Sequence, residues 1–89
     1  MRIKIRKSFG KDIDKITDKK LLQKIITTIQ EIENSENIQD VNNVKKMKGK
    51  ANAFRIRLGQ YRIGMFCINN EVELVRILQR KDIYKYFPQ

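Results

Sequence analysis

The hydrophobic pattern is clearest between residues 53 and 78, where it predicts β-structure. In residues 54–58 apolar and basic side chains alternate one by one. Successive side chains of a strand point to opposite faces, so the apolar residues face one side and Arg55 and Arg57 the other. This segment therefore predicts a strand with one hydrophobic face and one cationic face.

Two further apolar segments, residues 61–68 and 71–78, follow the first after very short gaps. The gaps are Gly59-Gln60 and Asn69-Asn70, and Gly and Asn tolerate the positive φ angles of two-residue hairpin turns. Three segments joined by two tight turns predict a three-stranded antiparallel meander.

Residues 1–6 also alternate between apolar and basic side chains, which predicts another strand of the same sheet. Ser8 is a candidate cap for a short helix in which Phe9, Ile13 and Ile16 recur at the spacing of one apolar stripe.

A second helix is predicted over residues 19–34, with Asp18 as its cap. Its apolar side is expected to carry the following residues: Leu22, Ile25, Ile26, Ile29 and Ile32. The short linker between the two helices predicts an antiparallel helical hairpin that packs on the apolar face of the sheet, with the other face left open.

Residues 34–52 are rich in Asn and Lys and are expected to form a loop, and residues 81–87 a short turn or helix that ends at Pro88. The predicted fold class is α+β: a small antiparallel sheet built from one strand, a helical hairpin and a meander, followed by the short C-terminal element. A chain of 89 residues is expected to form a single domain, residues 1–89, around one core.

Charge adds a candidate partner to this picture. The chain has 20 Lys and Arg against 10 Asp and Glu, a net charge of +10, and a pI of about 10.0. The excess is spread along the chain, which predicts a folded basic surface and not a detachable basic tail. Such a surface favours an anionic partner, either a nucleic acid or an acidic protein.

Several kinds of chemistry are excluded or disfavoured by composition. The chain has no histidine, so catalytic triads and histidine metal sites are excluded, and its carboxylates are not spaced as metal ligands. The single Cys67 cannot form an internal disulfide and is expected to be a buried, inert thiol in a reducing cytoplasm. No apolar run of 18 residues suggests a membrane span.

The remaining chemistry is an arginine set with nearby tyrosines. If the strand registers hold, one sheet face carries six basic residues: Arg2, Lys4, Arg6, Arg55, Arg57 and Arg62. Guanidinium groups bind phosphates bidentately, and Tyr84 or Tyr86 is placed to stack on a base. The residues alone leave two readings open, an RNA-binding face and a solvated charged face.

Three motifs in this order resemble the RelE/ParE toxin superfamily, specifically its RelE-like branch. They are NVKKMKG at residues 43–49, FRIRLGQYRIGMF at residues 54–66 and VRILQRKDIYKYF at residues 75–87. The resemblance spans nearly the whole chain and implies a ribosome-dependent mRNA endonuclease without metal or other cofactor. It also implies a cytoplasmic toxin held in a hetero-oligomer with a cognate antitoxin that is acidic where it covers the basic face.

By this resemblance the substrate's own 2′-OH attacks the adjacent phosphate in the ribosomal A site, and the protein supplies positioning, charge stabilisation and proton transfer. The implied catalytic residues are Arg55, Arg57, Arg62, Arg80, Lys81 and Tyr84, and the further RNA-binding residues are Arg2, Lys4, Arg6, Lys45, Lys46, Lys48, Lys50 and Tyr86. Both Arg62 and Arg80 are expected to be exposed on the sheet face.

The chain departs from the family pattern at the proton acceptor. Some relatives have lysines where Arg55 and Arg57 stand, and many have histidine where Gln79 stands. Arginine is a poor base, which leaves Lys48, Lys50, Lys81 or a tyrosine. Two alternatives follow: a ParE-like toxin that inhibits DNA gyrase by binding, and a catalytically inactive member that only binds its antitoxin.

Overall fold

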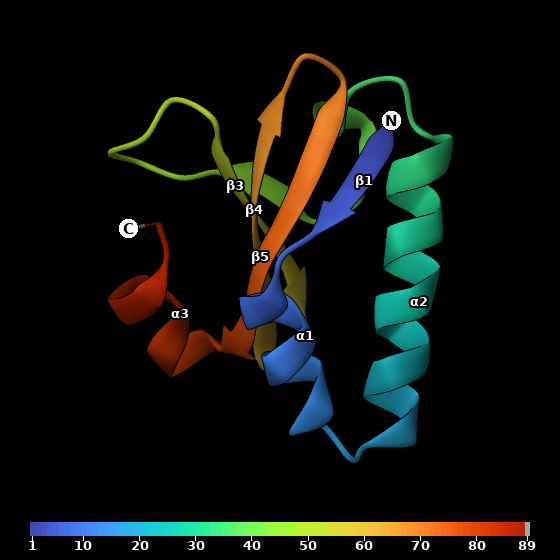
Figure 1. The fold of residues 1–89 in the computed structure, drawn as a ribbon, viewed down its shortest axis with the longest axis vertical. Coiled ribbons are helices and arrows are strands. Elements are labelled where there is room, and N and C mark those ends of the chain that lie inside the picture. Colours follow the sequence, from blue (N-terminus) through green and yellow to red (C-terminus); the bar gives the residue numbers. More distant parts are fainter. Residues whose placement is uncertain (89) are drawn as a thin grey trace.

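Residues 1–88 of the computed structural model form a five-stranded sheet with helices on both faces (Figure 1). The strands are β1 (Arg2–Ile5), β2 (Val44–Lys46), β3 (Ala53–Leu58), β4 (Tyr61–Ile68) and β5 (Glu71–Gln79), in the order β1-β5-β4-β3-β2. The helices are α1 (Lys7–Asp14), α2 (Lys19–Asn34), the short 3₁₀ helix η1 (Ile38–Asp40) and α3 (Arg80–Tyr86). The α+β class and the predicted meander are thereby confirmed.

The two predicted turns of the meander have the backbone that their residues favour. Gly59 has a φ of 59°, and Asn69 and Asn70 have φ angles of 51° and 64°. Positive φ at both residues, as in Asn69-Asn70, or at the first residue alone, as in Gly59-Gln60, gives a two-residue loop the twist that matches the flanking strands. These turns therefore set the end of β3, both ends of β4 and the start of β5.

The sheet differs from the prediction in two respects. It is mixed and not wholly antiparallel, because β1 pairs in parallel with β5, with Ile3 opposite Val72. Residues 44–46, predicted as loop, form the edge strand β2, in which Val44 lies opposite the buried Ile56. Alternation shows which face of the sheet a side chain takes, but it does not show whether two strands pair in parallel or antiparallel. A strand of three residues, such as β2, is also too short for alternation to be recognised in the sequence.

Helix α2 covers one face of the sheet, and its ends were predicted correctly. The Asp18 carboxylate accepts hydrogen bonds from the backbone N–H groups of Lys20 (2.9 Å) and Leu21 (3.3 Å), as expected of an N-cap. The buried stripe is rotated from the predicted one. Leu21 and Thr28 are buried, whereas Ile26 is 49% exposed. The Thr28 hydroxyl is satisfied by the Lys24 carbonyl at 2.8 Å, which allows this polar residue into the stripe.

Helix α1 lies against β5 beyond the point where β1 ends. There the strand has backbone groups without a neighbouring strand, and α1 satisfies them with side chains. The Ser8 hydroxyl donates to the Val75 carbonyl at 2.5 Å, and the Asp12 carboxylate accepts from the Ile77 N–H at 3.0 Å. Ser8 was predicted to cap the helix, and this was wrong, because its hydroxyl bonds to β5 and the N-cap position is Arg6.

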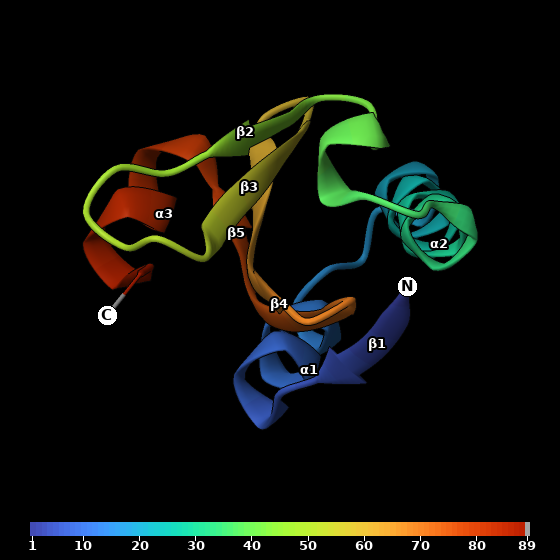
Figure 2. The ribbon, with the colours of Figure 1, turned by 90° about the horizontal axis from the view of Figure 1, so that it is seen from above.

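The opposite face of the sheet was predicted to be open, and it is partly covered by α3 (Figure 2). A second hydrophobic cluster forms there from Met47, Ala53, Val75, Ile83 and Phe87. The Phe87 ring lies so close to the backbone of β4 that a Cβ built on Gly64 would be 2.5 Å from its Cδ2 atom. Only glycine leaves room for this ring, so Gly64 determines where the C-terminal segment packs.

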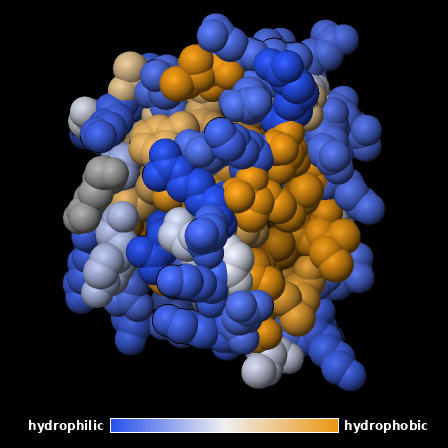
Figure 3. Space-filling view, viewed as in Figure 1, coloured by the Kyte–Doolittle hydropathy of each residue, from blue (hydrophilic) through white to orange (hydrophobic). Residues whose placement is uncertain are grey.

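Apolar side chains also reach the surface between β1 and α2 (Figure 3). Ile5 on β1 is 56% exposed and Ile26 on α2 is 49% exposed. Within residues 1–88 no helix combines the length and apolar character that a membrane span requires.

Candidate nucleic-acid interface

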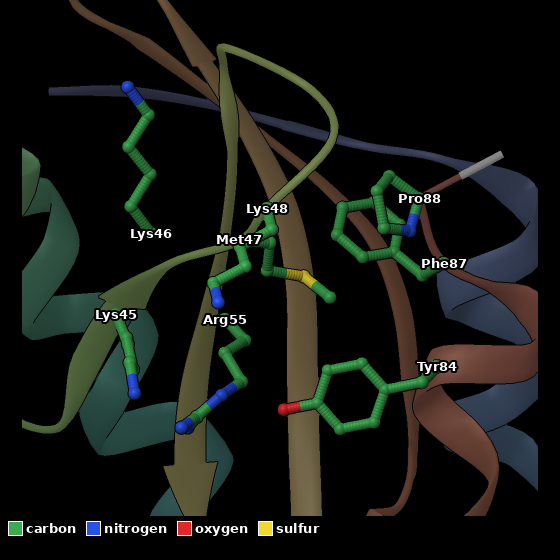
Figure 4. A pocket seen from close by; sticks show the side chains of 8 residues that line it. All are labelled: Lys45, Lys46, Met47, Lys48, Arg55, Tyr84, Phe87 and Pro88. Carbon is green, nitrogen blue, oxygen red and sulfur yellow. The ribbon is translucent and has the colours of Figure 1, made fainter.

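Two hollows lie on the α3 side of the sheet, and Tyr84 lines both of them. The first hollow has a volume of about 430 Å³ and four basic lining residues, which are Lys45, Lys46, Lys48 and Arg55. Its apolar wall is formed by Met47, Phe87 and Pro88 (Figure 4). The second hollow, of about 530 Å³, is lined by Gln60, Gln79, Arg80, Lys81 and Tyr84.

The first hollow brings Tyr84 of α3 opposite the basic residues of β2 and β3. In Figure 4 the Tyr84 hydroxyl points towards β3, where the Arg55 guanidinium lies, and Lys45 extends alongside that arginine. Lys45 and Arg55 are direct cross-strand partners, which fixes both on the same face. Lys46 extends away from Arg55 and Tyr84, as expected for the neighbouring residue of a strand.

Arg62 of β4 is buried, which contradicts the prediction that its side chain is exposed on the sheet face. Its side chain is 7% exposed, and Nη1 donates to the carbonyl oxygens of Gly59 (2.7 Å) and Tyr61 (2.9 Å). Burial lowers the pKa of the Arg62 guanidinium, and the charges of Arg55, Arg80 and Arg57 lower this pKa further. Arg62 therefore holds the β3–β4 turn at the centre of a concentrated positive field.

Arg80 is exposed, as predicted, and begins α3, where the next residue, Lys81, is exposed as well. The backbone N–H of Arg80 donates to the Gln60 carbonyl at 2.7 Å, so the start of α3 is attached to the β3–β4 turn. The side chain of Arg62 and the backbone of Arg80 thus hold the same turn. These contacts hold the backbone that lines the second hollow, and they do not involve the charged ends of the Arg80 and Lys81 side chains.

Arg57 is exposed at the end of β3, opposite Arg62 in the register. Its Nη2 donates to the Asn43 side-chain oxygen at 3.4 Å, and its backbone N–H donates to the Asn43 carbonyl at 3.2 Å. Arg57 does not line either hollow but contributes positive charge beside them.

The basic residues of β1 are separate from the hollows. Arg2 and Lys4 pair in register with Glu71 and Glu73, on the edge of the sheet opposite β2. Arg6 forms a 2.9 Å ion pair with Glu73, and its guanidinium lies 5.7 Å from the centre of the Phe66 ring. The registers place Arg2 and Lys4 on the same sheet face as Arg55, Arg57 and Arg62, as predicted, but Glu71 and Glu73 of β5 lie beside the β1 residues, which line neither hollow.

The structure also distinguishes the two candidate tyrosines. Tyr84 is 60% exposed and lines both hollows, whereas the Tyr86 ring lies 5.4 Å from the Arg76 guanidinium and lines neither. Residues two apart on a helix point in different directions, so both cannot face the same hollow. Lys50 is exposed but does not line a hollow.

Sequence reasoning did not identify Gln60 or the apolar wall of Met47, Phe87 and Pro88. One signal for the wall was present: an isolated glycine within a strand, such as Gly64, indicates a close approach of other atoms. Among residues 1–88 no three Cys, Asp or Glu side chains are grouped as metal ligands would be.

Comparison with known proteins identifies the family of the chain. Residues 3–84 match the family described as "ParE toxin of type II toxin-antitoxin system, parDE". The chain is similar to Toxin RelE3 of Methanocaldococcus jannaschii, with 37% identity over 89 residues, which cover 99% of this chain and 100% of that toxin.

Solved structures show the same fold. The toxin chain in the RelB-RelE antitoxin–toxin complex from Methanococcus jannaschii superposes with a TM-score of 0.81 at 35% identity, covering 96% of this chain and 99% of that one. The archaeal RelE-RelB complex from Pyrococcus horikoshii OT3 gives a TM-score of 0.74 at 20% identity, covering 92% and 97%. The chain therefore belongs to the RelE/ParE superfamily of type II toxin–antitoxin toxins, within its RelE family.

Proposed function

We propose that this toxin is an endoribonuclease that cleaves mRNA in the ribosomal A site. The observation that carries the proposal is Tyr84, which stands between a hollow that contains Arg55 and a hollow that contains Arg80. A phosphate group placed beside the ring is then within the field of arginines from two sides. Guanidinium groups bind phosphate oxygens in a planar, bidentate manner, which suits the charge that develops on them during cleavage.

The proposed reaction uses the RNA's own 2′-oxygen as nucleophile. This oxygen attacks the adjacent phosphorus and loses its proton, and the bond from phosphorus to the 5′-oxygen breaks. The 5′-oxygen takes up a proton, so the products are a 2′,3′-cyclic phosphate and a free 5′-OH. Arg55 and Arg80 stabilise the negative charge, with Arg57 and Lys81 beside them, and Arg62 keeps the turn between them in place.

The proton acceptor belongs to a shorter set than the sequence left open. Of the candidates Lys48, Lys50, Lys81 and Tyr84, all but Lys50 line a hollow. The Tyr84 hydroxyl points into the basic region from α3 (Figure 4). A general base must reach the proton that it removes, which favours these three residues. Lys45, Lys48 and the exposed Lys46 and Lys50 extend the same positive surface for RNA that enters from β2.

The test is a reconstituted translation reaction with mapping of mRNA 5′ ends. Codon-phased cuts with a 5′-OH are expected for the wild type, with loss of cutting in Arg80→Ala and in Tyr84→Ala. A matched control is Lys4→Ala, which removes an exposed cation from the separate β1 edge and is expected to cut normally. Intact mRNA in the presence of folded wild-type toxin would contradict the proposal.

A second candidate is inhibition of DNA gyrase by binding, without RNA cleavage. It is favoured by the family model that matches this chain, which describes a ParE toxin. The absence of carboxylate and imidazole groups from the lining of both hollows also favours it. A supercoiling assay separates the two: gyrase inhibition together with intact mRNA would select this candidate. A chain inactive in both assays that still binds its antitoxin would be a catalytically inactive member.

The proposed partner is a cognate antitoxin, as in the complexes formed by the similar toxins. A net charge of +10 favours a partner that is acidic where it covers the arginines, in a cytoplasmic hetero-complex. The apolar surface between β1 and α2 offers area for hydrophobic contacts in the same complex (Figure 3). Salt-sensitive association in a titration from low to high ionic strength is expected if acidic contacts contribute.

A further inference from the structure

A nearly buried carboxylate connects α1 to β5 at one side of the molecule. Asp12 is 5% exposed, and its oxygens accept from Arg76 Nε (2.7 Å), Arg76 Nη2 (3.0 Å) and the Ile77 N–H (3.0 Å). This bidentate contact allows one orientation of the Arg76 guanidinium plane. The hydrogen bonds that Arg76 donates to Asp12 raise the pKa of Arg76, so the group stays charged.

The fixed guanidinium in turn contacts α3. Its central carbon lies 5.4 Å from the centre of the Tyr86 ring, within the range of a cation–π interaction. Tyr86 is 53% exposed, so hydrophobic burial alone does not fix its ring. Asp12, Arg76 and Tyr86 therefore form one connected series from α1 through β5 to α3.

Helix α3 needs such a contact because it is short. It has seven residues, fewer than an isolated helix requires in water, and two buried side chains, Ile83 and Phe87, anchor it and the residue after it to the sheet. These two side chains, four residues apart, place one side of α3 on the sheet, and the hydrogen bond from the Arg80 N–H to the Gln60 carbonyl attaches its start. The contact of Tyr86 with Arg76 adds a further point of attachment on the α1 side, which restrains the direction in which Tyr84 points.

We propose that Arg76 and Tyr86 are positioning residues, which orient α3 so that Tyr84 and Arg80 face the hollows. The proposal rests on the function proposed above and reassigns Tyr86, which sequence reasoning had placed among the RNA-binding residues. Neither side chain needs to touch RNA for this role, because Tyr86 acts through the backbone of α3. Asp12 supports the pair by fixing the guanidinium plane.

The experiment compares Tyr86→Phe, which keeps the ring, with Tyr86→Leu, which keeps an apolar side chain but removes the π face. Two readouts are measured: the mRNA cleavage rate and the hydrogen exchange of the Phe87 amide, which donates to the Ile83 carbonyl at 2.9 Å in α3. The Ile63 amide in the buried sheet reports global stability, and Ile68→Ala, at a half-exposed site far from α3, is the matched control.

Tyr86→Leu is expected to speed Phe87 exchange and to slow cleavage by about tenfold each, with Ile63 exchange unchanged. Tyr86→Phe and Ile68→Ala are expected to stay within twofold of the wild type in both readouts. The proposal is overturned if Tyr86→Leu leaves either readout unchanged. It is also overturned if Tyr86→Phe loses as much cleavage as Tyr86→Leu, since the hydroxyl would then act directly. A wild type that does not cut refutes the proposed function instead, and Phe87 exchange still decides whether the pair orients α3.

Discussion

Gly64→Ala tests the contact that seats the C-terminal segment on the sheet. The added methyl group would lie 2.5 Å from Cδ2, 2.7 Å from Cγ and 3.0 Å from Cε2 of Phe87. These atoms belong to a rigid ring that is 1% exposed and packs at 5.1 Å, between ring centres, against Phe66. The ring therefore cannot rotate out of the way and must move off the sheet.

Two opposing effects set the magnitude. Replacing glycine by alanine restricts the unfolded chain and alone stabilises a protein by about 0.4–1 kcal/mol. Overpacking a buried site costs about 1–3 kcal/mol, and the loss of all Phe87 packing would cost about 3–5 kcal/mol, which is an upper limit. A net loss of about 1–2 kcal/mol is expected, or a fall in Tm of about 4–16 °C for a domain of this size.

A double-mutant cycle measures this contact directly. Urea unfolding, followed by circular dichroism, is compared for the wild type, Gly64→Ala, Phe87→Ala and the double variant. With the ring removed, Gly64→Ala is expected to be neutral or stabilising, so the coupling between the two sites is about 2 kcal/mol. Equal effects of Gly64→Ala in both backgrounds, within about 0.5 kcal/mol, would show that the ring does not require glycine beneath it.

Four further predictions concern charged and reactive groups. Arg62→Ala is expected to lower the free energy of unfolding by about 2 kcal/mol, because two charge-assisted hydrogen bonds to the β3–β4 turn are lost. Chemical denaturation measures this change. Unchanged stability would show that Arg62 does not hold the turn and would leave it only a ligand-binding role. Arg80→Ala, at an exposed side chain, is expected to abolish growth arrest with stability unchanged within about 0.5 kcal/mol; growth arrest that persists would remove Arg80 from the site. Asp12→Asn leaves Arg76 without its carboxylate and is expected to cost about 2 kcal/mol in the same unfolding assay, and a cost near zero would contradict the bidentate contact. Burial raises the pKa of the Cys67 thiol, so its alkylation by iodoacetamide at pH 8 is expected to be slower in the folded protein than in urea and to become faster as pH rises. Mass spectrometry measures the alkylation rate. Equal rates in the folded and the urea-unfolded protein would contradict this prediction.

The local elements were predictable because their signals are local. Asp18 begins α2 through bonds to N–H groups two and three residues away, and Asn69 and Asn70 adopt positive φ because of their own side chains. The half-buried Arg55 and the exposed Arg57 lie on the face opposite the buried Ile56, and this follows from alternation within one strand. None of these features depends on a distant part of the chain.

Part of the candidate site was predictable from the resemblance to the family. Arg55, Arg80, Lys81 and Tyr84 were singled out from the motifs and do line the two hollows. Their roles in catalysis remain predictions that the cleavage assay tests. Arg2 and Lys4 share the sheet face of Arg55, as predicted, but they lie on the far edge strand and line neither hollow, because alternation assigns a residue to a face and does not give the position of its strand in the sheet.

The sequence by itself determined the strands of the meander, the start and length of α2, the net positive charge and the superfamily. Tertiary structure alone decided the parallel pairing of β1 with β5, the burial of Arg62, the covering of the second sheet face by α3 and which of Tyr84 and Tyr86 lines the two hollows. The physical reason is the range of the interactions. Turns, caps and alternation are set by neighbours within a few residues, whereas these four outcomes depend on contacts between segments that only the folded chain brings together.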